Sequence, residues 1–82
     1  MAYFKHPATG HLTLITQTAF SYLGLNSDGQ HQVGLVGNYG SAPFKIYLGD
    51  TLALAEAAAE HGLELLTAKI EGGDTIIVID DF

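Results

Sequence analysis

Residues 51–61 read TLALAEAAAEH, the clearest structural signal in the chain. The run from 52 to 59 consists of strong helix formers, most of them alanine. Either Asp50 or Thr51 can cap this helix, because both side chains can accept a hydrogen bond from the free amides of the first turn. Gly62 is expected to end it, as glycine in a left-handed conformation commonly does. The sequence therefore predicts one helix that begins near Thr51 and stops at Gly62.

Before this helix, three segments alternate between apolar and polar side chains, as half-buried strands do. The segments are 11–23 (HLTLITQTAFSYL), 31–37 (HQVGLVG) and 44–48 (FKIYL). In the first, Phe20 and Tyr22 belong to the apolar phase, and the Asp28-Gly29 pair predicts a hairpin turn into the second. In the third, Phe44, Ile46 and Leu48 share a phase and are expected to be buried.

The segment after the helix admits two interpretations. Residues 63–70 (LELLTAKI) fit either a continued helix or a strand. The turn at 71–74 favours a hairpin into 75–79, whose consecutive β-branched residues indicate a central strand buried on both faces. The predicted order is β-β-β-α-β-β. We expect a single α+β domain over residues 1–82, in which a small antiparallel sheet of four to five strands carries one helix on a face.

The net charge of the chain excludes more kinds of function than it indicates. The chain contains no arginine, and its three lysines stand against nine carboxylates, which gives a formal net charge of −6. A nucleic-acid-binding protein needs a row of cations to displace condensed counterions, so direct nucleic-acid binding is not expected. The same charge favours a basic partner and is repelled by anionic membrane surfaces. It also serves solubility alone, which is the simpler interpretation.

No segment of the sequence predicts secretion or membrane insertion. The N-terminal residues lack an apolar stretch of signal-peptide length, and the longest apolar run, 76–79, is far too short to span a bilayer. The absence of cysteine is compatible with a reducing compartment. We therefore expect a cytoplasmic protein.

Catalytic and metal-binding patterns are also missing. His6 and His11 flank a turn, whereas His31 and His61 have no partner at a ligand spacing, so no set of three or four zinc ligands is defined. The chain has no cysteine nucleophile, no serine in a strand-turn-helix elbow and no phosphate-binding glycine loop. We expect no enzyme activity, no catalytic residue, no metal and no cofactor.

Two kinds of side chain are candidates for contact with a partner protein. Glutamates at positions i, i+4 and i+8 form an acidic stripe if the helix continues past Gly62, and two aspartates near the C-terminus add to it. Exposed tyrosines offer a large contact area at low entropic cost. The predicted partner-binding residues are Glu56, Glu60, Glu64, Tyr39, Tyr47, Asp80 and Asp81. The alternatives are an ordinary solvated helix face and tyrosines that cover a sheet edge.

In size, acidity and β-rich layout with one helix, the chain resembles small phage-encoded inhibitors, including anti-CRISPR proteins. Those families share no motif, so the resemblance transfers no functional residue. It implies a compact anionic inhibitor that docks on a basic, nucleic-acid-handling protein complex through a mixed acidic and tyrosine-bearing surface.

Two alternatives are considered beside the inhibitor. Residues 49–52 (GDTL), followed by an alanine-rich helix, resemble the segment that enters the helix of HicB-type antitoxin domains. The proline-rich loop of those domains is absent, since this region reads NYGSAPF. The other alternative is a homo-oligomeric structural or adaptor domain, because the glycine-containing strand at 31–37 is a candidate exposed edge for a homodimer.

Overall fold

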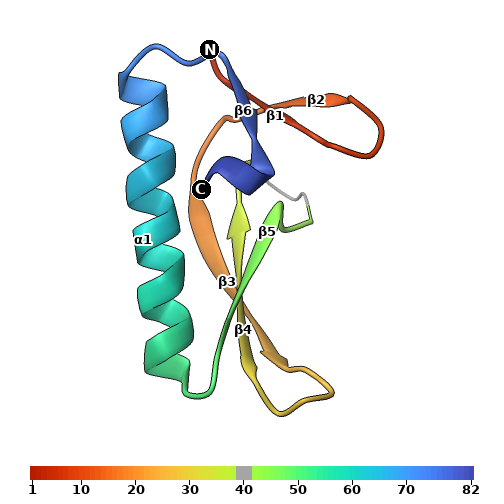
Figure 1. Ribbon diagram of the computed structural model, residues 1–82, viewed down its shortest axis with the longest axis vertical. Coiled ribbons are helices and arrows are strands. Elements are labelled where there is room, and N and C mark those ends of the chain that lie inside the picture. Colours follow the sequence, from red (N-terminus) through yellow and green to blue (C-terminus); the bar gives the residue numbers. More distant parts are fainter. Residues whose placement is uncertain (39–41) are drawn as a thin grey trace.

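The computed structural model describes residues 1–38 and 42–82, in which one helix lies beside two three-stranded sheets (Figure 1). The predicted α+β class, with one helix packed on a sheet face, is confirmed. The elements are β1 (Tyr3–Lys5), β2 (Leu12–Leu14), β3 (Ala19–Leu25), β4 (His31–Val36), β5 (Lys45–Gly49), α1 (Leu52–Glu71), β6 (Ile76–Val78) and the 3-10 turn η1 (Ile79–Asp81). The expectation of one antiparallel sheet is corrected to two sheets, and the order becomes β-β-β-β-β-α-β.

The first sheet has the strand order β2-β1-β6. Strand β1 pairs antiparallel with β2 and parallel with β6, so the two ends of the chain share one sheet. Strand β6 thus lies at an edge, with Ile76 45% exposed, and not at the centre as its β-branched run predicts. Its pairing partner β1 comes from the N-terminus, and three residues are too few to show a sequence pattern.

The predicted strand at 11–23 is divided between the two sheets. Strand β2 pairs with β1, and the chain then crosses to β3 in the second sheet. At the crossing, the backbone amides of Thr16 and Gln17 both donate to the carbonyl of Gly37, at 2.9 and 3.3 Å. These bonds take the place of regular strand pairing and separate the two strands.

The second sheet has the antiparallel order β3-β4-β5. Strand β4 therefore lies between two neighbours, and the expectation that 31–37 is an exposed edge is wrong. Val33 pairs with Tyr22 on one side and with Tyr47 on the other, so these three side chains share a face of the sheet. Gly34 is buried, and a Cβ there would lie 2.8 Å from the ring of Pro43.

Helix α1 begins as predicted and ends much later. The Thr51 hydroxyl accepts a hydrogen bond from the Leu54 amide at 3.2 Å and caps the first turn. The helix passes through Gly62 and stops at Gly72, whose amide donates to the Ala68 carbonyl at 2.9 Å. Gly62 allows close packing instead of ending the helix, because a Cβ there would collide with the hydroxyl of Tyr47. Residues 63–70 are consequently helical, which excludes the alternative strand.

Strand β5 faces the opposite way from the prediction. Ile46 and Leu48 are 48% and 46% exposed, whereas Tyr47 packs against a buried cluster formed by Val33, Ala55 and Ala59. The reason lies in the helix, whose small residues leave room for the tyrosine ring. A one-residue change of phase moves every side chain of a strand to its other face.

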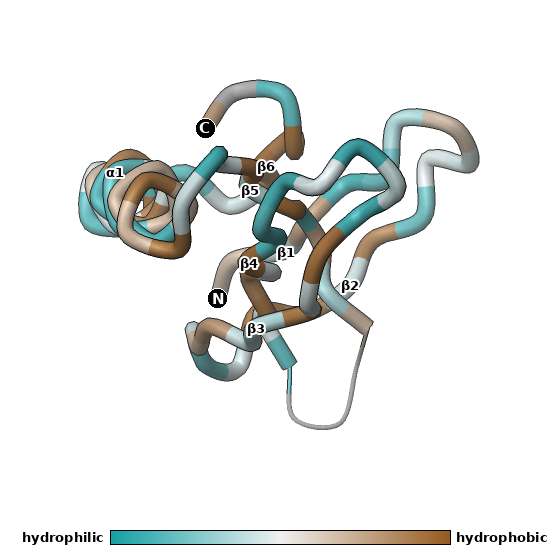
Figure 2. The backbone as a smooth tube through the Cα atoms, turned by 90° about the horizontal axis from the view of Figure 1, so that it is seen from below, coloured by the Kyte–Doolittle hydropathy of each residue, from teal (hydrophilic) through white to brown (hydrophobic). Residues whose placement is uncertain are grey.

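The main core joins both sheets, the second half of the helix and the C-terminus. Its fully buried side chains are Phe4, Leu35, Leu66 and Ile77. The ring of Phe4 lies 4.1 Å from that of Phe44 and 5.7 Å from that of Phe82, measured between centroids. Figure 2, seen from below, shows α1 as a separate layer beside β5, β4 and β3. The helix packs on β5 and β4, and this placement leaves β3 uncovered.

Candidate functional site

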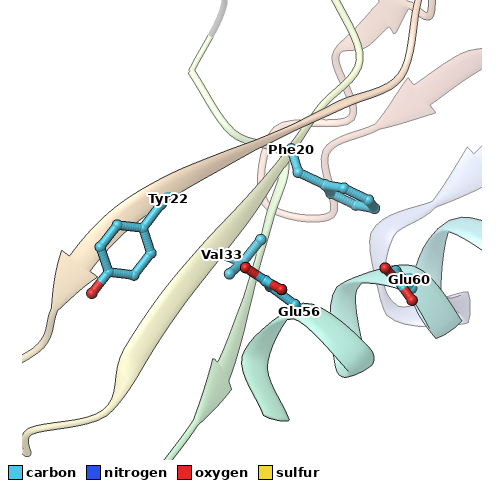
Figure 3. A pocket seen from close by; sticks show the side chains of 5 residues that line it. All are labelled: Phe20, Tyr22, Val33, Glu56 and Glu60. Atoms are coloured by element: carbon cyan, nitrogen blue, oxygen red, sulfur yellow. The ribbon is translucent and has the colours of Figure 1, made fainter. Parts of the chain in front are cut away.

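A groove of about 270 Å³ lies between β3 and α1 (Figure 3). We call it the β3–α1 groove. Its lining residues are Phe20, Tyr22, Val33, Glu56 and Glu60. The two rings come from β3, the valine from the central strand, and the two carboxylates from the helix. The groove therefore combines aromatic surface on one wall with negative charge on the other.

Local periodicity places each wall. Phe20 and Tyr22 are two residues apart on a strand, so both point to the face that carries Leu35 and Val33, their pairing partners. Glu56 and Glu60 are four residues apart on a helix, so they lie one turn apart on the same face. Phe20 and Tyr22 are 41% and 53% exposed.

The groove stays open because the helix approaches the other two strands more closely. Ala55 and Ala59 are fully buried against them, and Gly49 of β5 lies directly under the first helical turn. On the β3 side the helix presents long glutamate side chains, which cannot be buried without losing the hydration of their charge. The sheet and the helix therefore separate toward β3.

One ring of the groove is held by a hydrogen bond. The hydroxyl of Tyr22 lies 2.9 Å from Nδ1 of His31, and the two rings lie 5.9 Å apart between centroids. His31 is the first residue of β4 and is half-buried, so it provides a fixed attachment point. The bond restricts rotation of Tyr22 and keeps its ring at one end of the groove.

The chemistry of the groove suits a positively charged side chain with an apolar stem. Carboxylates accept hydrogen bonds from ammonium or guanidinium groups, and aromatic faces attract the same cations. The volume lies at the small end of the roughly 300–1,000 Å³ range of ligand pockets, and it has room for long side chains of a partner protein.

Of the predicted partner-binding residues, Glu56 and Glu60 lie in the groove. Glu64 continues the acidic stripe, because the helix passes through Gly62, but it does not line the groove. Asp80 is exposed in η1 and also lies outside the lining. Asp81 is the last residue of η1. Tyr39 lies outside the residues that the structure describes.

Tyr47 is not the exposed contact residue that its sequence phase predicts. Its ring lies between the second sheet and the helix, and its buried hydroxyl has no hydrogen-bond partner within residues 1–38 and 42–82. Burial raises the pKa of this hydroxyl above its ordinary value. Lys45 Nζ lies 5.6 Å from the ring centroid. Tyr47 therefore serves the helix–sheet contact.

The sequence interpretation missed the two aromatic residues of the groove. Phe20 and Tyr22 belong to the apolar phase of their strand and were not among the predicted partner-binding residues. Their alternation is visible in the sequence, but their exposure depends on where the helix lies across the sheet. No local pattern contains that information.

In the part of the chain that the structure describes, no group of three or more histidine and carboxylate side chains is placed to hold a metal ion. Among residues 1–38 and 42–82, no helix has the combination of length and apolar character that crossing a bilayer requires.

The chain was also compared with known proteins. No protein-family model, no curated protein and no solved structure matches it.

Proposed function

We propose that this protein is a small acidic binding module that docks on a basic protein surface through the β3–α1 groove. One observation carries the proposal: two partly exposed aromatic rings face two carboxylates across a groove of side-chain size. Aromatic residues give large contact area at low entropic cost, and the carboxylates select a basic partner.

The charge of the whole chain supports this choice of partner. Nine carboxylates and three lysines produce a negative field that accelerates encounter with positively charged surfaces. Surfaces that hold nucleic acid carry rows of lysine and arginine for phosphate contacts. By covering such a surface, the module would inhibit a nucleic-acid-handling complex, in the manner of the anti-CRISPR inhibitors that the chain resembles in size, charge and layout.

The test compares two charge-reversed variants as baits in a pull-down from the lysate of the source cell, at low and at moderate salt. The groove variant carries Glu56→Lys and Glu60→Lys. The control carries Glu71→Lys and Asp74→Lys, both exposed and outside the groove lining. Both variants change the net charge by the same amount, so a general electrostatic effect alters both equally.

The proposal expects the control to retain the same basic protein as the unmodified chain, and the groove variant to lose it. Circular dichroism should show the same helix content for all three proteins. A partner that both variants retain equally would contradict the groove as the binding site. If both variants lose the partner, the interaction depends on net charge alone, which also contradicts the proposal.

A second candidate function is self-association. Leu23, Ile46 and Leu48 lie on the face of the second sheet that is turned away from the helix, and all three are exposed. Contact between two such faces would give a homodimer. Sedimentation equilibrium over a wide concentration range tests this: a dimer that Ile46→Asp dissociates supports it, and a constant monomer mass rejects it.

A further inference from the structure

We propose that the segment bound in the β3–α1 groove is an extended chain that adds to the free edge of β3 as a further strand. Its alternate side chains, lysine or arginine, would enter the groove. This inference rests on the proposed function and specifies the conformation and the sequence pattern of the partner segment.

Strand β3 has the properties of an acceptor edge. It pairs only with β4 within residues 1–38 and 42–82, and it is the outermost strand of its sheet. In the same described part, the backbone of β3 makes no backbone–backbone hydrogen bond outside this pairing. Six of its seven residues are exposed. Such an edge presents amide and carbonyl groups that another strand can pair with.

The spacing of the groove residues matches that of an added strand. Side chains on one face of a strand recur every two residues, about 6.6–6.8 Å apart. Glu56 and Glu60 are four residues apart on the helix, a rise of about 6 Å. Figure 3 shows Phe20 on the side of Glu60 and Tyr22 on the side of Glu56. Two cations at alternate positions would therefore each meet one ring and one carboxylate.

A second copy of this chain does not fit as the segment that pairs with the edge of β3. Pairing of two β3 edges across a two-fold axis would bring two pairs of glutamates from the adjoining grooves toward each other. Each copy also carries a net charge of −6. Like charges placed in this way are a common protection of edge strands against self-pairing. The same carboxylates favour a basic strand.

An extended segment suits the free edge of β3 better than a helix does. The backbone groups of a helix are paired within the helix, so a bound helix would leave the edge of β3 unpaired. The β3–α1 groove, at about 270 Å³, has room for inserted side chains. An extended segment leaves its backbone on the edge of β3 and inserts only alternate side chains.

The experiment uses three synthetic peptides and the full-length protein. In the first peptide, about nine residues long, lysine and threonine alternate. The second has the same composition with the lysines in adjacent pairs, which divides them between the two faces of a strand. The third repeats the first with N-methyl groups on alternate amides, which removes strand hydrogen bonds and keeps the charge. Fluorescence anisotropy gives Kd, and NMR identifies the amides that shift.

The inference expects the alternating peptide to bind at least about tenfold more tightly than the paired and the N-methylated peptides. The shifted amides should belong to β3, and Glu56→Lys with Glu60→Lys should abolish binding. Equal affinity for all three peptides would overturn strand addition. No peptide binding, with the cellular partner still retained through the groove, would overturn it as well. In both of these outcomes the proposed function survives, because it fails only when partner retention is independent of Glu56 and Glu60.

Discussion

The two long sides of helix α1 meet the second sheet in opposite ways. Toward β4 and β5 the helix presents Ala55 and Ala59, both fully buried, together with the buried Gly62. Toward β3 it presents Glu56 and Glu60, and a groove remains. The difference shows that side-chain size and charge on one helix set its distance from each strand. The groove is the consequence of close packing on the other side.

The closed side is held by contacts that leave little room. Gly49 lies under the first turn, and a Cβ there would collide with the backbone nitrogen of Ala55 and lie 2.8 Å from the carbonyl carbon of Leu54. The ring of Tyr47 fits where Gly62 has no side chain. The open side has no such constraint, so substitutions on the two sides should differ in their effect on stability.

The largest effect is expected for Gly49→Ala. The added methyl meets backbone atoms of the helix, which cannot rotate away, so the first turn must move off β5. Overpacking of this kind should lower the free energy of unfolding by about 2–3 kcal/mol. Urea denaturation at pH 7 measures it. A loss below about 0.5 kcal/mol would show that the helix can shift freely on this side.

Gly62→Ala is the matched comparison for Gly49→Ala, because here the obstacle is a side chain. In the unmodified chain the clash with Tyr47 should outweigh the helix-propensity gain of about 1 kcal/mol. In a Tyr47→Leu background the clash is absent, so Gly62→Ala should become stabilising. Gly49→Ala should remain destabilising in both backgrounds, since its obstacles are backbone atoms, and urea denaturation of the variants measures both changes.

A smaller effect, of opposite sign, is expected for Tyr47→Phe. The Tyr47 hydroxyl is buried with no hydrogen-bond partner among the residues that the structure describes, so its removal should stabilise the fold by about 1 kcal/mol. The pKa of this hydroxyl is raised in the folded state from its ordinary value of 10.0. Above pH 10 the unfolded chain loses this proton while the folded chain keeps it, so stability falls as pH rises toward the folded pKa.

The tyrosine prediction is measured by urea denaturation of both proteins between pH 8 and pH 11. The advantage of Tyr47→Phe should be constant up to about pH 9 and should grow above pH 10. The other tyrosines are present in both proteins and cancel in the difference. A variant less stable than the unmodified chain would mean that the hydroxyl contributes a favourable contact.

The smallest effect on stability is expected on the open side, for Glu60→Lys. The substitution replaces two like-charge pairs, with Glu56 and Glu64, by two opposite-charge pairs at helical spacing. It should stabilise the fold by about 0.5 kcal/mol at low salt, less at high salt, while binding to the basic partner is lost. Thermal unfolding at two salt concentrations measures the first effect. A destabilisation above 1 kcal/mol would assign Glu60 a structural role.

Several elements of the fold follow from local patterns. The Thr51 cap, the alanine-rich first half of α1 and strands β4 and β5 all lie where the sequence predicts them. Half of the candidate site was also predicted, because the spacing of Glu56 and Glu60 is a property of the helix alone. These features depend on neighbours at most four residues away, so the sequence pattern alone is enough to predict them.

The features that the sequence did not predict depend on contacts between distant segments. The local sequence predicts that Gly62 ends the helix, whereas in the fold Gly62 lies within the helix and packs against Tyr47. The contact with Tyr47 is not visible in the local pattern. The face of β5 depends on the same contact. Strand β6 lies at an edge because it pairs with β1, more than seventy residues earlier in the chain.

The helix and the strand periodicity are thus determined by the local sequence, because each arises from the backbone and from neighbouring side chains. The net charge is determined by composition alone. The exposure of Phe20 and Tyr22 arises only when α1 settles on β4 and β5. That position is set by the fit of small residues against the sheet, in contacts such as Gly62 with Tyr47 and Ala55 with Val33, which lie 15 and 22 positions apart in the sequence. The spacing of the glutamates in the sequence therefore determines the acidic wall of the groove, whereas the groove itself forms only when the helix packs on the sheet.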